Sequence, residues 1–591
     1  MTELYKLLDY SYMMKHKNKE RERLLQSGEL QEKKIAVLCG STLGEIKEFL
    51  EIFLLYYGIK PVFYIGEYNR FYEEAAFPNE ELDKFHPDIV LVHVTNRNLL
   101  WEHDFHALED DKRRLREIWN VLGEKYHCII IQNNFEYFKY RMIGNAARTY
   151  EDGNLKYIDD LNRFISDCSS ENKNLFVNDI NFLSSYTGLR KWSDERLWNM
   201  YKYPMAMDEM PRYALSIANI IKSVYGKNKK TIITDLDNTL WGGEVGEVGV
   251  ENIKLGNETP QGEAFSELHR YLKYLTLHGI VLNICSKNEY DIGISGVNCA
   301  KSVLKEKDFA IKKINWRNKA DNIEDILKEL SLLSSSAVFI DDSLVECDSV
   351  GAMIPDIETI QAADTKDLLN EIDALSFFEV TQITQEDGQR SRYYADNVER
   401  NKEQNKYKNY DEYLNALKMV CHIDTIRNEN IDRVVQLMNK TNQFNFLTKR
   451  YTLETMNAHI NRLGIKTFVL DLEDKFGSNG IVSVAIVRFE NKAAHIDDWI
   501  MSCRVFERGL EYVMLTLICE TCMENGVDTL YGYYNRTEKN MKIAGFFQNI
   551  GFEEVDNDTN DNKITKWICN DINGLLKKSE NNNIVVRNIG K

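Results

Sequence analysis

The sequence has 591 residues, of which 43% are hydrophobic and 28% charged, an ordinary globular composition with apolar material for several cores. It excludes a disordered chain, a collagen-like chain and a small disulfide scaffold. The 74 lysines and arginines face 92 aspartates and glutamates, and the resulting net charge of −18 argues against nucleic acid or an anionic membrane as a partner.

Three features predict a cytoplasmic protein without membrane attachment. No apolar run reaches the ~18 residues that a membrane span needs. Residues 1–25 carry too much charge for a secretory signal. The 11 cysteines are scattered along the chain, which is typical of reduced thiols.

In chain order, residues 1–205 and 206–380 each alternate short apolar runs with helical segments. Strands separated by helices form βαβ units and parallel sheets, so both stretches predict α/β domains. The strand candidates of the first stretch are residues 35–39, 62–65, 89–93 and 128–131. Those of the second stretch are residues 231–235, 280–285, 309–311, 337–340 and 357–360.

The rest of the chain changes character. Residues 381–420 are polar and charge-rich, which predicts a solvated helical connector. Residues 421–572 show an α+β pattern, and residues 573–591, rich in asparagine and lysine, predict a mobile tail. The strand candidates of the α+β stretch are residues 466–472, 480–490, 493–501 and 529–534. The expected fold class is therefore a multidomain α/β protein.

The strongest chemical signal is the sequence TIITDLDNT at residues 231–239. An apolar strand ends there in Asp-x-Asp-x-Thr, which places Asp235 and Asp237 at the carboxyl end of a predicted parallel strand, where α/β folds hold their ligands. Close carboxylates need a cation to offset their repulsion, and Mg²⁺ prefers oxygen ligands of this kind. The pair therefore predicts a Mg²⁺ site.

Three more pieces follow in order along the chain. Ser286 comes after the next strand and is suited to binding a phosphate oxygen. Lys319 stands at a predicted helix start, where its charge would clamp an anion. Asp341 and Asp342 end a further strand. Each piece alone is a weak signal, but all of them in order predict a site of phosphoryl transfer rather than structural residues.

These motifs resemble those of the haloacid dehalogenase-type (HAD) phosphotransferase superfamily. The strings LDNTLWGGEVGEVGVENIKLGNETPQGEAF, ICSKNE, INWRNKADNI and VFIDDSLVEC are similar to the FkbH-like family, and the similarity covers nearly the whole chain. The resemblance implies an enzyme that captures a phosphoglyceryl group from 1,3-bisphosphoglycerate, removes its phosphate and delivers glycerate as a thioester on an acyl carrier protein. Such glyceryl units are building blocks for polyketides and related metabolites.

The resemblance also implies a role for each motif. Asp235 would be the nucleophile that takes the phosphoryl group, and Asp237 the general acid/base. Thr239 and Ser286 would bind phosphate oxygens. Lys319 would offset the charge of the transferring group.

The implied Mg²⁺ site draws on the same residues. Asp235, the main-chain carbonyl of Asp237 and the carboxylate of Asp341 would hold the ion. Asp342 would be a second carboxylate near the metal or an orienting group. Mg²⁺ is the one cofactor that the resemblance implies.

The implied thioester intermediate needs a cysteine. Cys285 adjoins Ser286 and is the first candidate, but alternation along a strand would turn the two side chains to opposite faces, so a buried core thiol is an equal alternative. Cys503 precedes a predicted helix, whose N-terminus would lower the pKa of a thiol, and is the second candidate. Cys347 is the third and fits packing better.

Residues 421–570 resemble a GNAT-type acyltransferase fold, whose Arg/Gln-x-x-Gly-x-Gly/Ala loop binds the pyrophosphate of coenzyme A. The matching stretch is RVFERG at residues 504–509, with Glu507 in place of the first glycine. A carboxylate there would repel a pyrophosphate. The groove is therefore predicted to receive the phosphopantetheine arm of a carrier through Arg504, Arg508 and Asn535. Solvated arginines at a helix start are the alternative.

Three other polar residues of this region are weaker candidates. Asn540 accompanies Asn535 near the expected acyl end, and His495 and Asp498 are possible acid/base groups. A core or surface role explains each of them equally well.

The stretch KIAVLCGSTL puts Ser41 directly after a strand and resembles the start of SGNH-type hydrolases. Asn96 and either Asn133 or Asn134 fall at later strand ends, as oxyanion-hole groups would. The Asp-x-x-His pair that should follow is missing from the candidate stretches, and a serine without a base is a weak nucleophile. A scaffold, substrate-shaping or carrier-docking role is therefore favoured over a hydrolase.

Two other enzyme classes remain open. One is an acyltransferase for another acyl group, against which Glu507 counts. The other is a plain HAD small-molecule phosphatase, against which the extra domains count. A carrier protein is normally acidic, so it would need a local basic patch to dock on this acidic chain.

Overall fold

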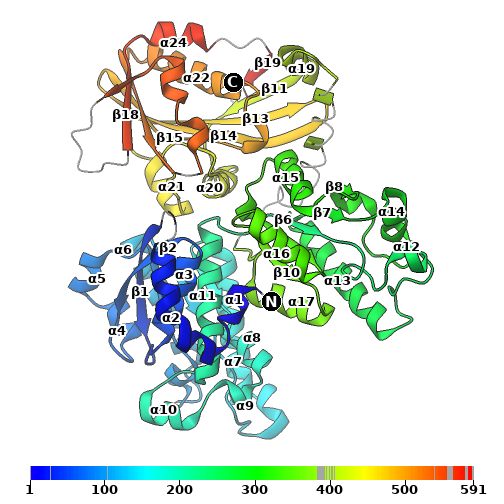
Figure 1. The fold of residues 1–591 in the computed structure, drawn as a ribbon. Coiled ribbons are helices and arrows are strands. Elements are labelled where there is room, and N and C mark those ends of the chain that lie inside the picture. The colour runs from blue at the N-terminus through cyan, green and yellow to red at the C-terminus, as the bar shows by residue number, and fades with distance from the viewer. Residues whose placement is uncertain are drawn as a thin grey trace.

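The computed structural model describes residues 2–588 except 27, 29, 103, 382–392, 394–395, 398–399, 401–402, 405, 538, 556–563 and 580–582. Three β-sheets, each with its own helices, make three units that meet at one junction (Figure 1). We call them the first, second and third units in chain order. The multidomain α/β fold expected from the sequence is confirmed. Within the described ranges, the helices lack the length and apolar character that a membrane crossing requires.

The first unit is built on a five-stranded parallel sheet in the order β2-β1-β3-β4-β5. The sequence predicts four of these strands and misses β5, whose three apolar residues stand between polar ones and give little periodic signal. The strands are β1 (Gln31–Cys39), β2 (Ile59–Ile65), β3 (Ile89–His93), β4 (Ile129–Asn133) and β5 (Leu175–Asn178).

Helices cover both faces of this sheet. Alternate residues of β1 point to opposite faces, so Val37 packs under α3 and α11 while Leu38 packs under α6 and α7. The helices are α1 (Glu3–Lys6), α2 (Tyr10–Leu25), α3 (Ile46–Tyr56), α4 (Phe71–Ala76), α5 (Glu80–Phe85), α6 (Leu108–Tyr126), α7 (Asn154–Glu171), α8 (Ile180–Thr187), α9 (Leu189–Trp192), α10 (Glu195–Tyr201) and α11 (Met210–Val224).

The helix α11 packs on the first unit, although the sequence places it at the start of the second domain. It lies against α3 along its length, and its Tyr213 is fully buried among strand ends of the first sheet. Its far end also reaches the second unit, where Lys222 donates a hydrogen bond to the carbonyl of Ser376 at 2.7 Å. The predicted boundary at residue 206 therefore falls before a helix that the first unit needs.

The second unit carries another five-stranded parallel sheet, in the order β10-β9-β6-β7-β8. All five strands fall on predicted segments. The strands are β6 (Thr231–Thr234), β7 (Val281–Ser286), β8 (Phe309–Ile314), β9 (Ala337–Asp341) and β10 (Glu358–Gln361). The helices are α12 (Val245–Val248), α13 (Pro260–Leu277), α14 (Tyr290–Asn298), α15 (Lys319–Leu330), α16 (Leu344–Met353) and α17 (Thr365–Leu375).

The third unit is an α+β layer whose sheet follows the order β17-β18-β16-β15-β14-β13-β11-β19. β15 and β16 are parallel neighbours, as are β11 and β19, and the other neighbours are antiparallel. The strands are β11 (Met419–Asp424), β12 (Phe444–Asn445), β13 (Ile465–Asp474), β14 (Gly477–Glu490), β15 (Ala493–Met501), β16 (Thr529–Asn535), β17 (Glu553–Val555), β18 (Ile564–Cys569) and β19 (Ile584–Asn588).

Both ends of the third unit differ from expectation. Residues 584–588, predicted within a mobile tail, form β19 and pair with β11, because the sheet edge offers them backbone partners. In the predicted connector, residues 382–392 lie outside the described residues, whereas α19 buries Leu414 and Leu417 in the third core. The helices are α19 (Tyr410–Leu417), α20 (Ile431–Lys440), α21 (Leu453–Ile460), α22 (Leu510–Glu524), α23 (Phe546–Ile550) and α24 (Ile572–Lys578).

Polar contacts join the three units at the junction. Tyr56 of the first unit donates a hydrogen bond to Glu358 of the second at 3.0 Å. Asn174 of the first unit donates to Glu454 of the third at 3.1 Å. Lys230 of the second unit donates to the carbonyl of Lys440 in the third at 3.3 Å. The third unit therefore rests on both of the others (Figure 1).

Candidate active site

The site of the second unit forms where β6 and β9 end side by side. The main-chain N–H of Asp235, the residue after β6, donates to the carbonyl of Ile340 in β9 at 2.9 Å. The chain then turns at Asn238, whose φ of +56° lies in the left-handed region that asparagine tolerates. This turn brings the carboxylates of the two strand ends to the same edge of the sheet.

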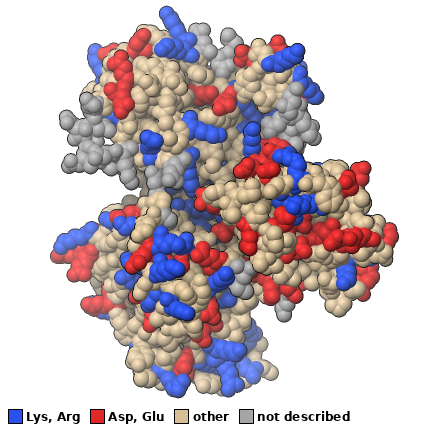
Figure 2. All heavy atoms as spheres, viewed as in Figure 1, with Lys and Arg blue, Asp and Glu red and all other residues tan. Residues whose placement is uncertain are grey.

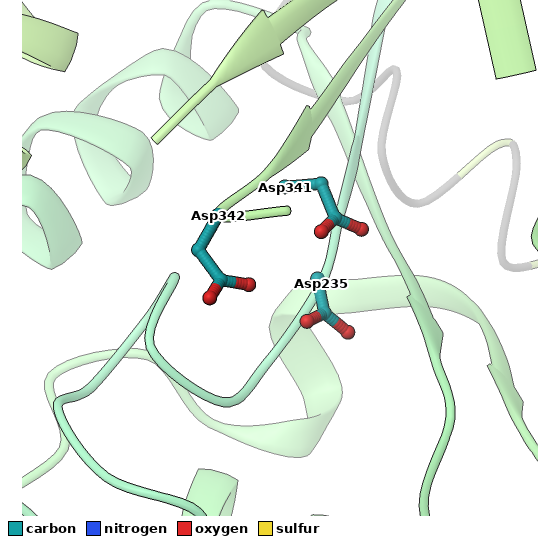
Figure 3. Close-up of side chains that lie close together, drawn as sticks. All are labelled: Asp235, Asp341 and Asp342. Atoms are coloured by element: carbon teal, nitrogen blue, oxygen red, sulfur yellow. The ribbon is translucent and has the colours of Figure 1, made fainter. Parts of the chain in front are cut away.

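Three carboxylates converge there. Asp235, Asp341 and Asp342 each offer an oxygen, and these oxygens lie within 4.8 Å of one another (Figure 3). Burial, and next the Asp235 carboxylate, raise the pKa of Asp342 above its ordinary value. The same two causes raise the pKa of Asp341 to about 6. Such crowding of hard oxygen ligands suits a small divalent cation, which would offset the repulsion.

Lys319 faces these carboxylates from the first turn of α15. Its ammonium lies 2.6 Å from Asp341 Oδ2 and 3.1 Å from Asp235 Oδ1. Burial would lower the pKa of Lys319, but the two carboxylates outweigh it and raise the pKa, so the residue is held as a cation. A fixed positive charge beside Asp235 is what a transferring phosphoryl group requires.

Asp237 is fixed in a different environment from the other aspartates. Its Oδ1 accepts hydrogen bonds from Trp241 Nε1 at 2.8 Å and the main-chain N–H of Val245 at 2.9 Å. Its Oδ2 accepts from Asn288 Nδ2 at 3.0 Å. Burial raises its pKa, which suits a group that gives and takes a proton. Its carboxylate is therefore not part of the cluster formed by Asp235, Asp341 and Asp342. The prediction that Asp237 contacts the metal through its main-chain carbonyl is compatible with this arrangement.

Sequence reasoning missed the partners that hold Asp237 in place. Asn288 stands two residues after Ser286 in the loop that follows β7, and Trp241 lies one turn after Asp237. No spacing rule links either residue to the aspartate, because the contacts depend on how the loops fold back over the strand ends.

The two predicted phosphate ligands lie in the site, but in different ways. The hydroxyl of Thr239 accepts the main-chain N–H of Asp342 at 3.0 Å, so it anchors the loop that carries that carboxylate. Ser286 ends β7 beside the site and is 2% exposed. Phosphate binding by either residue stays a prediction.

Cys285 does not share the site with Ser286. It is fully buried in the core under α15, on the other face of β7, and its thiol donates to the carbonyl of Lys319 at 3.6 Å. Burial raises its pKa to about 12, which removes the thiolate that acyl transfer needs. Cys347 is buried in the same way. The structure therefore does not support Cys285 as the acyl carrier.

Cys503 is the predicted cysteine that stays accessible. It is half-buried and lies in a short 3₁₀ turn, Cys503–Val505, while α22 begins only at Leu510, so the expected position at a helix N-terminus is wrong. It lines a cleft between the second and third units together with Lys230 and Arg504. Lys230 and Asp235 stand at opposite ends of β6, so this cleft and the carboxylate site lie at opposite edges of one sheet.

Part of the loop predicted to bind a carrier arm makes contacts within the protein instead. Arg508 is 7% exposed, and its Nη2 donates to Asn397 of the connector at 3.2 Å. Its Nη1 lies 3.6 Å from Asp474, which also pairs with Arg400. The buried network therefore argues against Arg508 as a carrier contact. Arg504, by contrast, lies beside the cleft with its guanidinium 4.8 Å from the ring centre of Tyr393.

A short segment fills the space where the central strands of the third sheet part. β15 and β16 pair only at residues 493–495 and 529–531. Beyond that point β12 lies between them and pairs with β15 opposite Met501 and Ile500. On its other side, the main-chain N–H of Asn535 in β16 donates to the carbonyl of Phe446 at 2.7 Å.

The two asparagines predicted near an acyl end hold this segment. Asn540 Nδ2 donates to the carbonyl of Asn445 at 3.0 Å, and Asn535 Nδ2 donates to Thr448 Oγ1 at 3.4 Å. Phe444 and Phe446 are each 1% exposed, inside an aromatic cluster around Trp499. The structure therefore gives Asn535 a structural task in place of a carrier contact.

The acid/base candidates of the third unit are also engaged internally. His495 Nδ1 is hydrogen-bonded to Tyr533 OH at 2.8 Å, and its ring stacks on Tyr531. Asp498 is 1% exposed and lies 3.4 Å from Lys449. Burial raises the pKa of Asp498 to about 6. Neither side chain lines either of the two described clefts.

The first sheet holds a polar cluster at its own carboxyl edge. Ser41 Oγ is 3.0 Å from Nε2 of His93, the last residue of β3, and His93 Nδ1 is 2.6 Å from Tyr213 OH. Asn133 Nδ2 donates to the same phenol oxygen at 2.8 Å. Ser41 therefore has a histidine partner that sequence reasoning missed, because it looked for the base only near the end of the domain.

This cluster is sealed. Ser41, His93, Asn133 and Tyr213 are all 0% exposed. Burial lowers the pKa of His93 to about 4, so its ring is neutral. Asn96 Nδ2 donates to the carbonyl of Glu136 at 3.3 Å, and Asn134 donates to Asp179 at 2.7 Å, which leaves neither amide aimed at Ser41. The network therefore pairs a serine with a histidine, as a hydrolase site does, but none of its four side chains is accessible to solvent.

Comparison with known proteins agrees with this geometry. Residues 58–222 match the family described as FkbH, N-terminal domain. A solved structure of the N-terminal part of the protein BF1531 from Bacteroides fragilis, which contains a phosphatase domain complexed with Mg, is similar with a TM-score of 0.59 at 25% identity. The similarity covers 62% of this chain and 99% of that one. No curated protein matches this chain.

The third unit gives only faint matches. The ribosomal-protein-S18-alanine N-acetyltransferase from Escherichia coli has a TM-score of 0.20 at 14% identity and covers 25% of this chain and 91% of its own. Scores this low support no argument, so the GNAT resemblance stays a prediction, as does the SGNH resemblance of the first unit.

The fold and site therefore define a multidomain α/β enzyme with a HAD-type carboxylate centre. Its residues 58–222 match the FkbH N-terminal domain family, and the chain is similar to a structure that contains a Mg-bound phosphatase domain.

Proposed function

We propose that this chain is a HAD-type phosphatase that removes the phosphate of a phosphoglyceryl group and passes the glyceryl group to the thiol of an acyl carrier protein. The observation that carries the proposal is the placement of Lys319 against Asp235 and Asp341, while Asp237 is held by hydrogen bonds of its own. This arrangement separates a nucleophile from an acid/base, as two-step phosphoryl transfer requires.

In the first step, an oxygen of Asp235 attacks phosphorus. The bond between phosphorus and the substrate oxygen breaks, and Asp237 donates its proton to the leaving oxygen. In the second step, Asp237 takes a proton from water as the water oxygen attacks the aspartyl-phosphate. Inorganic phosphate leaves, and the carboxylate of Asp235 is restored. Lys319 stabilises the charge of the transferring group in both steps.

The cofactor that fits the site is Mg²⁺. The carboxylates of Asp235, Asp341 and Asp342 would hold it, because three buried or half-buried oxygens in this space need a counter-charge beyond Lys319. When bound, the ion would supply Lewis-acid stabilisation of phosphate oxygens. The Mg-bound phosphatase domain of BF1531 supports this choice.

The proposed substrate and partner are those that the FkbH resemblance implies. An FkbH-like protein is expected to take its acyl group from 1,3-bisphosphoglycerate and to deliver it to the phosphopantetheine thiol of a carrier protein, in polyketide-type or related biosynthesis. Because Cys285 and Cys347 are buried, Cys503 is the one of the three predicted cysteines that such a transfer could use. An acyltransferase for another acyl group is disfavoured by β12, which fills the gap between β15 and β16. A plain small-molecule phosphatase is the remaining alternative.

The test uses the purified full chain with Mg²⁺, 1,3-bisphosphoglycerate and a phosphopantetheinylated carrier protein. We expect glyceryl-carrier and inorganic phosphate by intact mass and phosphate assay. Asp235→Asn should still load a phosphoglyceryl group but lose at least about a thousandfold of the phosphate release from it, since the nucleophile is gone. Phosphate release from small phosphoesters with no acyl transfer would leave only the plain phosphatase.

A further inference from the structure

The first unit exposes large apolar side chains on the segments that follow β4 and β5. Met200 of α10 is 68% exposed, and Tyr140, in the loop after β4, is 70% exposed. Helices and loops that only face water carry polar residues at such positions. Aromatic residues and methionine exposed together are typical of a protein–protein contact. The exposed set comprises Tyr140, Met142, Ile143, Tyr150, Phe182, Tyr186, Met200 and Tyr201.

Hydrogen bonds show that the segments carrying these side chains adjoin one another. Asn181 of α8 donates to the carbonyl of Phe135, in the loop after β4, at 2.9 Å. Lys139 of the same loop donates to the carbonyl of Ser193, between α9 and α10, at 2.6 Å. The helix α8 packs against α9. Residues 137–150 and 180–203 therefore make one surface of the first unit, which we call the basic face.

The basic face carries positive charge on an acidic chain. Its residues include seven lysines and arginines but two carboxylates, in a chain of net charge −18. Both carboxylates are paired within the face, Glu195 with Lys139 at 3.5 Å and Asp194 with Arg196 at 3.6 Å. In the part of the chain that the structure describes, no carboxylate pairs with the remaining exposed or half-buried cations of α9, α10 and the loop, Arg141, Arg190, Lys191 and Lys202.

The basic face lies on the same side of the molecule as the carboxylate site. Asn174, just before β5, contacts Glu454 of the third unit, and Lys230, just before β6, contacts the carbonyl of Lys440 there. The amino ends of both parallel sheets thus face the third unit, so their carboxyl ends point away from it (Figure 1). The segments after β4 and β5 therefore share one side with the aspartates after β6 and β9.

The loop beside the carboxylate site has the opposite charge. Residues 243–251 expose Glu244, Glu247 and Glu251 and contain no lysine or arginine. Figure 2 shows carboxylates gathered over the second unit, and lysines and arginines at the lower end of the first unit, where Figure 1 labels α9 and α10. An acidic partner is therefore repelled at this loop and attracted to the basic face on the same side.

We infer that the basic face docks an acidic protein, whose attached group then reaches the carboxylate site of the second unit. The free arginines and lysines would meet its carboxylates, while Met200 and Tyr201 would pack against its apolar side chains. The inference rests on the proposed function, under which this partner is the acyl carrier protein and its flexible arm crosses to Asp235. A second copy of this chain fits less well, because a symmetric pair would bring like charges together.

The first experiment titrates phosphopantetheinylated carrier protein in the transfer assay, with the full chain, Mg²⁺ and 1,3-bisphosphoglycerate. Arg190→Glu/Lys191→Glu reverses two exposed charges in the last turn of α9. We expect the KM for the carrier to rise at least about tenfold with little change in kcat, since the chemistry is elsewhere. Phosphate release from p-nitrophenyl phosphate, which needs no carrier, is measured on the same preparation. A loss of folded protein lowers both rates and is divided out.

The matched control is Lys577→Glu/Lys578→Glu, which reverses two adjacent exposed lysines in the last turn of α24, on the third unit. It should leave the KM for the carrier unchanged. Tyr201→Ala should raise that KM several-fold, and added salt should raise it in the wild type more than in Arg190→Glu/Lys191→Glu. An equal rise in both double variants, or no rise in Arg190→Glu/Lys191→Glu, would overturn the inference.

The second experiment measures binding without turnover, by fluorescence anisotropy of a labelled carrier protein. Arg190→Glu/Lys191→Glu should weaken binding at least about tenfold, and a carrier with two surface carboxylates changed to lysine should recover part of it. If the carrier binds at the basic face but no transfer occurs, the docking surface stands and the proposed function fails. If transfer occurs with the same KM in this variant, the proposed function stands and the docking surface is wrong.

Sedimentation of the full chain tests the other occupant. We expect the oligomeric state of the wild type and of Tyr201→Ala to be the same. A wild-type dimer that Tyr201→Ala separates into monomers would show that the basic face joins two copies of this chain, and it would overturn the inference.

Discussion

The first and second units place polar residues at the same point of the same kind of sheet, with opposite results. In both, five parallel strands end at an edge occupied by serine, aspartate or histidine. In the second unit Asp237 and Asp342 are half-buried, and Asp235 keeps 6% of its surface exposed. In the first unit, Ser41 and His93 are 0% exposed.

The difference comes from what covers each edge. The helix α11 inserts Tyr213 over the strand ends of the first sheet and satisfies both His93 and Asn133. At the second sheet, the chain turns at Asn238 soon after Asp235, and Lys319 lies 3.1 Å from the Asp235 carboxylate. Strand-end chemistry therefore locates a potential site, and the covering element decides whether a substrate can enter it.

The largest effect should come from removing the charge that the open edge depends on. Lys319→Met leaves Asp235 and Asp341 without their shared cation, and we expect phosphate release to fall about a thousandfold. Loss of a partner from a buried ion pair should also destabilise the second unit. When no metal ion is present, we expect the free energy of unfolding to fall by about 3 kcal/mol. Mg²⁺ should restore part of that stability but little activity. Phosphate assays and thermal unfolding with EDTA or Mg²⁺ measure both. Unchanged turnover would show that Lys319 serves only the fold.

The next effect separates acid/base catalysis from binding. Asp237→Asn keeps an acceptor for Trp241 and Val245 but cannot give or take a proton. We expect kcat to fall about a hundredfold to ten-thousandfold for an alkyl phosphate. For p-nitrophenyl phosphate, whose leaving group needs no proton, the first step should be far less affected, and burst kinetics would show it. An equal loss of the first step for both substrates would contradict the role of Asp237.

The sequence predicts which side chains of the second unit come together, because the signals are local. Asp235, Ser286, Lys319 and Asp341 each stand at the end of a strand or the start of a helix, and parallel topology brings such ends together. The same reasoning finds Ser41 in the first unit, but it cannot see that α11 closes over it. Nor can it see β12, since two residues between β15 and β16 have no periodicity to detect.

Errors about the cysteines have the same physical origin. Alternation along β7 separates Cys285 from Ser286, and the structure confirms that they face opposite sides. Cys503 becomes a candidate again only through the packing of two units, which no local pattern encodes. Contacts between distant segments, as for His93 and Tyr213, likewise escape a reading of motifs.

The sealed edge predicts a pH-dependent stability. Burial lowers the pKa of His93 from 6.5 to about 4. Between pH 4 and pH 6.5, His93 is therefore protonated in the unfolded chain and neutral in the folded chain. The contribution is fully present above pH 6.5 and is lost as the pH falls toward 4, amounting to about 3 kcal/mol. His93→Gln should flatten this part of the pH profile of thermal unfolding.

His269 provides the matched control for that measurement. It is buried in the second unit, and burial also lowers its pKa to about 4. His269→Gln should flatten the profile of the second unit and leave the first unit unchanged. If His93→Gln has the same acid sensitivity as the wild type, the network is open to solvent, and the contrast between the two edges fails.

The smallest effect tests the contrast directly with a matched pair of serines. Ser41→Ala removes the partner of His93 Nε2 inside a sealed network, so we expect a loss of about 1–2 kcal/mol in stability and no change in phosphate release or transfer. Ser286→Ala removes a hydroxyl at the open edge and should raise KM or lower kcat several-fold with little effect on unfolding. If Ser41→Ala impairs transfer, the contrast between the two sheets is wrong. In that case α11 would have to move during turnover, and the strand ends of the first sheet would form a functional site.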